Sequence, residues 1–353
     1  MRDAQDTKTP VGVVGAGSWG TALANLLAEK GFPVDHWVYE DDVRQQMTDN
    51  RENTRFLPGV RLSDNLCPSG DLEAVVTGKK MVLVVTPSHV TRQIMGACGP
   101  AIDAQTLVVS ASKGIENKTH LTISGVLGEA ISHLDPGRLA VLTGPSFAKE
   151  VARHVPTVVT VASHQTDTAV AVQRMFATPF FRVYTISDMI GAELGGSVKN
   201  VIAIAAGMID GLGLGFNTRA ALITRGLAEI RRLGLVMGAC SRTFSGLAGA
   251  GDLILTCTGE LSRNHTIGKE IGQGKKLGDL LAGMHMVAEG VKTAKSVYNL
   301  SRKLGVEMPI SHAVYRILYE DLDPKAALHQ LMTRDLKQEL DEDRENEEAG
   351  FRK

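Results

Sequence analysis

The stretch Val11-Gly12-Val13-Val14-Gly15-Ala16-Gly17-Ser18-Trp19-Gly20 decides the fold of this chain. It joins a short run of β-branched residues to the pattern Gly-x-Gly-x-x-Gly, and apolar residues at helical spacing follow up to Gly31. A second predicted strand, residues 34–39, ends beside Glu40, twenty residues past Gly20. A strand, a glycine-rich turn, a helix and a strand that ends at an acidic residue form the context in which this pattern binds a dinucleotide.

Each glycine of the pattern has its own predicted role. Gly15 allows the tight turn, Gly17 lets the backbone approach a pyrophosphate, and Gly20 lets the helix pack closely on the strand. The free N–H groups and the positive end of the helix dipole then face the phosphates. Glu40 can accept hydrogen bonds from the ribose hydroxyls of NAD and would repel the 2′-phosphate of NADP; the alternative is a solvated acid at a strand end. We therefore predict a site for NAD that includes Tyr39 and Glu40, with NADP as the second choice.

Short apolar runs continue to alternate with helical patterns beyond the second strand. The runs lack the period-two alternation of half-exposed strands, as expected for a parallel sheet that helices cover on both faces. They span residues 81–85, 107–109, 139–142 and 158–161. We therefore expect an α/β Rossmann-like, doubly wound domain over residues 1–190.

The pattern changes near residue 190, because helical spacing alone continues from there. This change predicts an all-α domain over residues 191–336, which would carry the substrate and the catalytic groups. Residues 337–353 hold seven acidic and four basic residues and are predicted to form a disordered tail.

Charge and cysteine content argue against several classes of protein. The net charge is −1, from 38 basic and 39 acidic residues, so a surface that binds nucleic acid is not expected. Cys67, Cys98, Cys240 and Cys257 are far apart and form no Cys-x-x-Cys pair, which predicts neither a disulfide framework nor a metal site. The first residues are polar, and the longest apolar run, residues 201–209, is shorter than the about 20 residues that cross a bilayer. We expect a cytoplasmic protein without an integral membrane segment.

Lys199 is the strongest candidate for proton transfer. Its neighbours at three and four residues along a helical pattern are small and apolar, so a charge there is costly. Desolvation lowers the pKa of a lysine toward the range useful for general acid–base catalysis. The alternative is a lysine near a helix start that extends its ammonium group to solvent.

Other polar segments lie where ligands bind in this kind of fold. Lys113 and Gly144-Pro145-Ser146 follow predicted strands, and open α/β sheets bind ligands at that edge. Asp252 follows two glycines, and Ser262-Arg263-Asn264 places the fork of an arginine beside hydroxyl and amide donors, as a phosphate requires. Read singly, each segment is also compatible with an ordinary polar loop.

Taken together, these motifs resemble one family, the soluble bacterial NAD(P)-dependent glycerol-3-phosphate dehydrogenases. They occur in family order and span roughly residues 11 to 310. The motifs are Gly-Ala-Gly-Ser-Trp-Gly-Thr-Ala-Leu-Ala at 15–24, Ser-Lys-Gly at 112–114, Gly-Pro-Ser-Phe-Ala at 144–148, Val-Lys-Asn-Val at 198–201, Ala-Gly-Ala-Gly-Asp-Leu at 248–253, Ser-Arg-Asn at 262–264 and Val-Ala-Glu-Gly at 287–290. The resemblance implies a homodimer with its active site between two domains. It also implies reversible reduction of dihydroxyacetone phosphate to sn-glycerol 3-phosphate by NAD(P)H, which supplies glycerophospholipid synthesis.

The resemblance further implies roles for individual residues. Lys199 would be the general acid and base, with Asp252 orienting its ammonium group. The residues expected to contact or support the substrate are Lys113, Gly144, Ser146, Lys199, Asn200, Asp252, Thr256, Ser262, Arg263 and Asn264. The resemblance adds Ser18, Trp19, Lys113, Ala148, Arg263, Val287 and Glu289 to the three glycines, Tyr39 and Glu40 of the predicted cofactor site. Family members often carry a basic residue near the end of the second strand, where this chain has Tyr39-Glu40, so the resemblance leaves NAD versus NADP open.

Two other interpretations fit parts of the pattern. A 3-hydroxyacid or 6-phosphogluconate-type dehydrogenase also pairs a Rossmann domain with a helical domain and uses a lysine on a buried helix. Ser262-Arg263-Asn264 and Gly144-Pro145-Ser146 favour the glycerol-phosphate assignment over it. A nucleotide-binding sensor or scaffold that lacks catalysis is the other interpretation, and the intact Lys199 and Asp252 argue against it.

Overall fold

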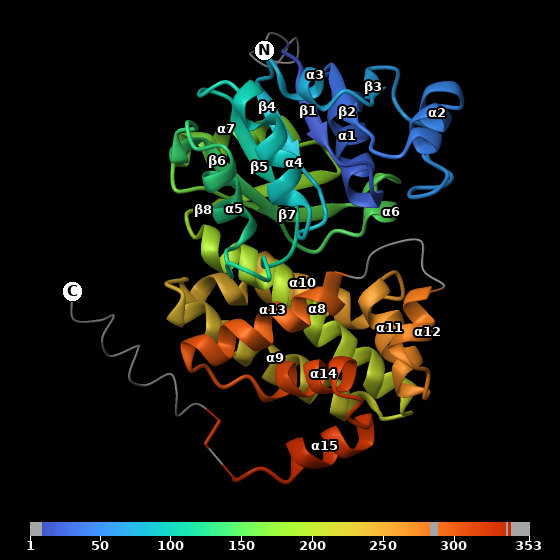
Figure 1. Cartoon of the computed structure of the whole chain (residues 1–353), viewed down its shortest axis with the longest axis vertical. Coiled ribbons are helices and arrows are strands. Elements are labelled where there is room, and N and C mark those ends of the chain that lie inside the picture. The colour runs from blue at the N-terminus through green and yellow to red at the C-terminus, as the bar shows by residue number, and fades with distance from the viewer. Residues whose placement is uncertain (1–8, 283–288, 337, 340–353) are drawn as a thin grey trace, which may run out of the picture.

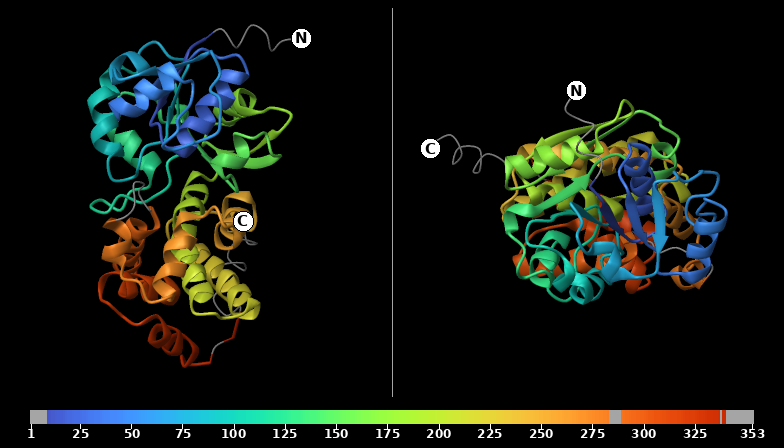
Figure 2. Two further views of the ribbon diagram at one scale, coloured as in Figure 1. Left: turned by 90° about the vertical axis from the view of Figure 1, so that its right-hand side faces the viewer. Right: turned by 90° about the horizontal axis from the view of Figure 1, so that it is seen from above.

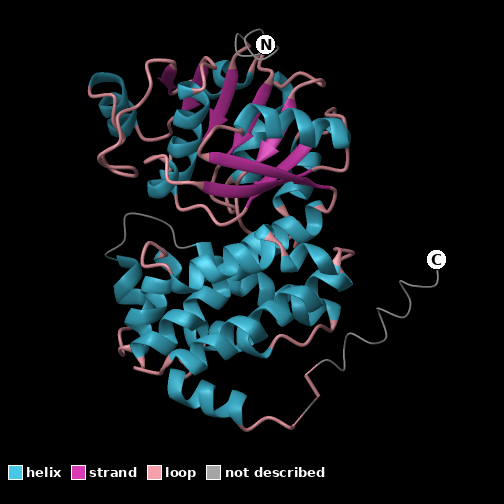
Figure 3. Cartoon of the chain, turned by 180° about the vertical axis from the view of Figure 1, so that it is seen from behind, coloured by secondary structure: helices cyan, strands magenta, loops and turns pink. Residues whose placement is uncertain are grey.

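The computed structural model describes residues 9–282, 289–336 and 338–339, which form two stacked parts (Figures 1 and 2). The upper part is a sheet flanked by helices, and the described segments of the lower part are helices and loops (Figure 3). A Rossmann-like α/β domain followed by an all-α domain is the fold class that the sequence predicts, and this prediction is confirmed. The predicted acidic tail at 337–353 lies outside the described residues except for 338 and 339.

Eight strands form one sheet in the order β3-β2-β1-β4-β5-β6-β7-β8. They are β1 Val11–Val14, β2 Val34–Trp37, β3 Leu66–Ser69, β4 Met81–Val84, β5 Leu107–Ser110, β6 Leu139–Thr143, β7 Thr157–Ala162 and β8 Phe181–Ile186. Neighbouring strands are parallel apart from β6 and β7, which are antiparallel. The chain order reverses at β1, which lies between β2 and β4, and open α/β sheets bind ligands beyond the carboxyl ends of the strands at such a point.

Burial explains which strands the sequence predicts and which it misses. The strands β1, β4, β5 and β6 are buried along their whole length, which matches their unbroken apolar runs. The two strands at the edges of the sheet were not predicted. The strand β3 contains Pro68, and in β8 the exposed side chains of Arg182 and Tyr184 interrupt the apolar run. A proline is tolerated at a sheet edge because that strand lacks a neighbour on one side.

Helices cover both faces of the sheet (Figure 1). They are α1 Ser18–Glu29, α2 Asp41–Asp49, α3 Leu72–Val76, α4 Thr91–Cys98, α5 Ile123–Ala130, α6 Ala148–Val151 and α7 Thr166–Phe176. The helix α1 begins directly after the glycine-rich turn, and its Leu23 and Leu27 are buried in the core beside β1. This packing fixes the start of α1 at the carboxyl edge of the sheet.

The second domain is built around one buried helix. Its helices are α8 Met189–Gly211, α9 Phe216–Val236, α10 Asp252–Thr258, α11 Arg263–Gly272, α12 Leu277–Ala282, α13 Glu289–Leu304, α14 Pro309–Tyr319 and α15 Pro324–Met332. Among the described residues, α8 alone is long and apolar enough to cross a membrane, but 94% of its most apolar window is buried inside the protein. It is therefore the core helix of this domain, and it carries Lys199.

Candidate active site between the domains

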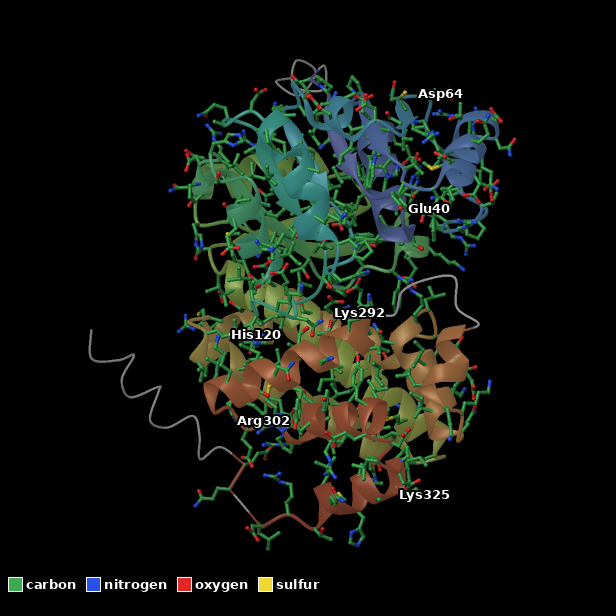
Figure 4. The ribbon with its side chains drawn as sticks, viewed as in Figure 1. Glu40, Asp64, His120, Lys292, Arg302 and Lys325 are labelled. Carbon is green, nitrogen blue, oxygen red and sulfur yellow. The ribbon has the colours of Figure 1, made fainter. Side chains whose placement is uncertain are left out.

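A cavity of about 600 Å³ lies at the carboxyl edge of the sheet and is lined by both domains. The first domain contributes the glycine-rich turn and the residues that follow β2, β4 and β5, while the second contributes Asn200, Arg263, Asn264 and Glu289. Figure 4 shows Glu40 on the upper domain, with Lys292 of α13 across the junction on the lower domain. The cavity therefore joins the predicted nucleotide residues with four of the predicted substrate residues, Lys113, Asn200, Arg263 and Asn264.

The glycine-rich turn has the geometry that a pyrophosphate requires. Gly15 has φ +113°, in the region that favours glycine, and a Cβ on Gly20 would lie 2.0 Å from the Gly15 carbonyl oxygen. A Cβ on Gly17 would meet no described atom within 4 Å, so its backbone faces open space. Within the described chain no side chain caps the start of α1, and the positive end of a helix dipole attracts an anion.

Two residues that sequence reasoning missed hold this turn in place. His36 Nε2 bonds the Gly15 carbonyl oxygen at 3.0 Å, and Asn53 Nδ2 donates to the Ala16 carbonyl oxygen at 2.9 Å. Burial lowers the pKa of His36 to about 4, so the ring is neutral and its Nε2–H can donate. A histidine inside the predicted strand at 34–39 was the available sequence signal, whereas Asn53 had none.

The groups beside the turn fit an adenine dinucleotide. Trp19 lines the cavity, and its Nε1 is buried without a hydrogen-bond partner in the described parts of the chain. Tyr39 is 76% exposed and its ring lies 5.9 Å from that of Trp37, while the half-buried Glu40 stands at the N-terminus of α2. An unpaired indole donor, an exposed aromatic face and a carboxylate at the end of β2 are groups that an adenosine and a ribose can engage.

Other predicted cofactor residues have different surroundings. The Ser18 hydroxyl lines the cavity but donates to the Phe56 carbonyl oxygen at 2.6 Å. Ala148 is the first residue of α6 and is absent from the cavity lining, and Val287 lies outside the described residues.

Lys199 and Lys113 share one buried carboxylate. Asp252 is 1% exposed; its Oδ1 accepts a hydrogen bond from Lys199 Nζ, and its Oδ2 lies 2.7 Å from Lys113 Nζ. Lys199 Nζ also donates to Thr256 Oγ1 at 2.6 Å. A single π-helical turn, Leu247–Gly251, precedes α10 and sets Asp252 at the first position of that helix. The loop predicted around Asp252 is therefore helical, and π-turns of this kind recur at functional sites.

Burial sets the protonation behaviour of Lys199. Desolvation lowers its pKa to about 7, the Asp252 carboxylate opposes this, and the nearby Lys113 ammonium adds to the lowering. An amine with a pKa near 7 can both donate and accept a proton at neutral pH. The alternative of a solvent-extended lysine is wrong, because Lys199 is 6% exposed.

The first turn of α11 contributes an arginine and an amide to the cavity lining. Ser262 Oγ accepts a hydrogen bond from the His265 backbone N–H at 3.2 Å and caps the helix, after which Arg263 and Asn264 enter the cavity lining. Burial lowers the pKa of Arg263, which the Glu289 carboxylate opposes. Glu289 in turn accepts a hydrogen bond at 2.9 Å from Ser88 Oγ of the first domain, a contact that sequence reasoning missed.

Close packing of α8 on α11 fixes the position of Arg263 relative to Lys199. A Cβ on Gly207 of α8 would lie 2.0 Å from the His265 carbonyl oxygen, and one on Gly268 of α11 would lie 2.0 Å from the Ile204 carbonyl oxygen. A side-chain network adds to this contact: Asp210 Oδ2 lies 2.8 Å from His265 Nε2, and its Oδ1 accepts from Arg219 Nε at 3.0 Å. The helix with Lys199 and the helix with Arg263 therefore form one rigid unit.

Several predicted substrate residues already have partners within the protein. The Ser146 hydroxyl donates to the Gly144 carbonyl oxygen at 3.1 Å, and Thr256 Oγ1 donates to the Asp252 carbonyl oxygen at 2.6 Å. Gly144 has φ +146°, and a Cβ there would lie 3.0 Å from Val159 Cα. These residues shape the site around Lys199, while Lys113, Asn200, Arg263 and Asn264 line the cavity itself.

In the described residues, no group of three or more His, Cys, Asp and Glu side chains is placed to hold a metal ion. The four cysteines are free thiols.

Known proteins resemble this chain over most of its length. Residues 10–169 match the family model described as NAD-dependent glycerol-3-phosphate dehydrogenase N-terminus, and residues 188–329 match the corresponding C-terminus. A relative named glycerol-3-phosphate dehydrogenase [NAD(P)+] from Syntrophobacter fumaroxidans is 54% identical over 94% of this chain and 98% of its own length. One of the same name from Geobacter sulfurreducens is 54% identical over 93% of this chain and 98% of its own.

A solved structure shows the same fold. The crystal structure of glycerol-3-phosphate dehydrogenase from Coxiella burnetii has a TM-score of 0.89 at 41% identity and covers 93% of this chain and 100% of its own. These findings confirm the resemblance seen in the motifs and do not favour a 3-hydroxyacid or 6-phosphogluconate-type dehydrogenase. The chain belongs to the NAD-dependent glycerol-3-phosphate dehydrogenase family.

Proposed function

We propose that this protein reversibly reduces dihydroxyacetone phosphate to sn-glycerol 3-phosphate with NADH, and that it accepts NADPH less well. The observation that carries the proposal is the surroundings of Lys199: it is buried and shares the Asp252 carboxylate with Lys113, which lines the same cavity as the glycine-rich turn and Arg263. The names of the relatives, which include both cofactors in the form NAD(P)+, support the same activity.

The residues divide the chemistry between them. When bound, the nicotinamide supplies the hydride that reduces the ketone carbon. The Lys199 ammonium stabilises the negative charge that develops on the ketone oxygen and donates its proton there; in the reverse direction the neutral amine accepts the hydroxyl proton. Asp252 and Thr256 hold Nζ in place through both steps. Lys113 is paired with the same carboxylate and lines the cavity, so its ammonium can bind the substrate beside Lys199.

Arg263 and Asn264, at the start of α11, hold the phosphate group of the substrate. A guanidinium fork and an amide at the start of α11 provide charge-assisted hydrogen bonds to phosphate oxygens. Because α8 and α11 pack backbone to backbone, phosphate binding positions the ketone relative to Lys199. The residues that support the site through contacts within the protein, without lining the cavity, are Gly144, Ser146 and Ser262.

Glu40 supports the preference for NADH. Its carboxylate can accept hydrogen bonds from the ribose hydroxyls, whereas a 2′-phosphate beside it meets a like charge. The other cofactor contacts come from the glycine-rich turn and from Trp19, Tyr39 and Glu289.

The same assignment leads to proposals for the domain division, the oligomeric state and the cellular location of the protein. We infer a division at residue 190, with the nucleotide held by residues 1–190 and the catalytic groups supplied by residues 191–336. We also infer a cytoplasmic homodimer whose product enters glycerophospholipid synthesis, and static light scattering of the purified protein would test the dimer.

Steady-state kinetics with dihydroxyacetone phosphate, comparing NADH with NADPH, test the function. We expect turnover with both cofactors and a higher kcat/KM with NADH. Absence of turnover, together with activity on a 3-hydroxyacid or 6-phosphogluconate, would show that the substrate assignment is wrong.

A further inference from the structure

Thr143 is a buried hydroxyl without a partner, next to the proposed catalytic groups. It is the last residue of β6 and is 3% exposed. Its Oγ1 has no hydrogen-bond partner among the residues that the structure describes. Burying an unpaired hydroxyl destabilises a folded protein, so such a group beside the proposed catalytic residues requires an explanation.

The side chain of Thr143 faces α8, the helix that carries Lys199. A Cβ built on Gly196 of α8 would lie 2.6 Å from Thr143 Oγ1 and 3.9 Å from Lys113 Cδ. Because residues three and four apart share one side of a helix, Lys199 and Asn200 follow Gly196 on the same side of α8. The hydroxyl therefore lies beside the stem of Lys113 and one helical turn from Lys199.

Three hydroxyl groups of the predicted site segments differ from Thr143 because each has an acceptor within the protein. Ser112 Oγ donates to the Val84 carbonyl oxygen at 3.3 Å. Ser146 Oγ and Thr256 Oγ1 donate to the backbone carbonyl oxygens of Gly144 and Asp252. Among these four hydroxyls, Thr143 alone keeps its proton available for a ligand.

We propose that Thr143 binds the substrate: its Oγ1–H donates a hydrogen bond to an oxygen of the phosphorylated ketone that Lys113 also binds. The contact positions the substrate and involves no bond formation or cleavage at Thr143. This proposal rests on the proposed function, because it takes the ketone phosphate as the ligand. It also explains the glycine at 196, since any side chain there would displace the threonine hydroxyl.

The test is Thr143→Val, which replaces the hydroxyl with a methyl group of nearly the same size. We expect kcat/KM for dihydroxyacetone phosphate to fall about tenfold or more, mainly through KM, as for the loss of one hydrogen bond to a ligand. The Kd for NADH should stay within about twofold of the wild-type value, and Tm should be equal or higher because an unpaired buried hydroxyl is gone. Thr143→Ser should restore most of the efficiency.

Thr293→Val is the matched control. Thr293 lies on α13, is buried, and also has an Oγ1 without a partner in the described segments, so the same chemical change is made on a different element of the fold. The kcat/KM of Thr293→Val for dihydroxyacetone phosphate should remain at the wild-type value.

Two results would overturn the proposal, and they are distinguishable. Wild-type kcat/KM in a folded Thr143→Val protein, or in Thr143→Ala if the valine variant does not fold, shows that the hydroxyl is an unpaired structural group and leaves the proposed function intact. Absence of ketone-phosphate turnover in the wild-type protein refutes the proposed function and this contact with it.

Discussion

The two walls of the cavity recognise their ligands in different ways. The nucleotide wall is the contiguous stretch from Gly15 to Gly20, and it offers backbone N–H groups at a helix start. The catalytic wall is a set of side chains from separate segments: Lys113 and Arg263 line the cavity, and Lys199 on α8 is held beside Lys113 by the shared Asp252 of α10. The comparison teaches that backbone recognition is local in sequence, whereas side-chain chemistry here depends on how separate helices pack.

Glycines serve both walls, but for different reasons. At Gly17 a Cβ would meet no atom of the described chain within 4 Å, so the absent side chain leaves room for a ligand. At Gly268 a Cβ would lie 2.0 Å from a backbone oxygen of α8, so the absent side chain lets two helices touch. Substitutions should therefore damage binding at the first position and stability at the second.

The largest expected effect belongs to the catalytic wall. Lys199→Met removes the proton donor while keeping an unbranched apolar stem, and kcat should fall by about 10²- to 10⁴-fold, the usual contribution of general acid–base catalysis. The Kd for NADH, measured by fluorescence titration, should be unchanged because the nucleotide wall is intact. A kcat within a few-fold of the wild-type value would remove Lys199 from the mechanism.

The nucleotide wall should respond to Gly17→Val with a loss of binding alone. The side chain would occupy the space in front of the helix start, so we expect the Kd for NADH to rise about 10- to 100-fold. The Tm should stay near the wild-type value, and the matched control Gly96→Val, at an exposed position of α4 with equal free space, should leave Kd unchanged. A lower Tm accompanying the weaker NADH binding of Gly17→Val would contradict the distinction between the two kinds of glycine.

Gly268→Ala should show the opposite pattern. One methyl group between the backbones of α8 and α11 forces them apart and should cost about 1–3 kcal/mol in the free energy of unfolding. Thermal denaturation measures this as a lower Tm, and KM for dihydroxyacetone phosphate should rise as Arg263 moves away from Lys199. An unchanged Tm would mean that the two helices are not in backbone contact.

Glu40 lines the cavity beside the nucleotide wall, and the smallest effect is expected there. Glu40→Gln removes a half-buried charge, so the ratio of kcat/KM with NADPH to that with NADH should rise several-fold, as for an interaction of about 1 kcal/mol. Asp49→Asn, at the far end of α2, is the control and should leave the ratio unchanged. A fixed ratio in Glu40→Gln would make Glu40 a solvated acid without a role in cofactor choice.

The same contrast explains what could be predicted from the sequence. The glycine-rich turn and its flanking strands are local, and the surroundings of Lys199 follow from helical spacing, so both were predicted from their residues alone. His36, Asn53 and Ser88 were missed because each acts through contacts between segments that are distant in sequence. The edge strand β8 was missed because its half-exposed face does not give a continuous apolar run.

The pH dependence of wild-type kcat/KM in both directions tests the role of Lys199 most directly, because kcat/KM reports the ionisation of the free enzyme. Burial lowers the pKa of Lys199 to about 7, so the ammonium that donates a proton is present below pH 7 and the neutral amine above it. Ketone reduction should therefore fall as the pH rises through about 7, while oxidation of glycerol 3-phosphate should rise through the same pH, and Lys199→Met should lose both limbs. Flat wild-type profiles in both directions, or the same limbs in Lys199→Met, would contradict proton transfer by Lys199.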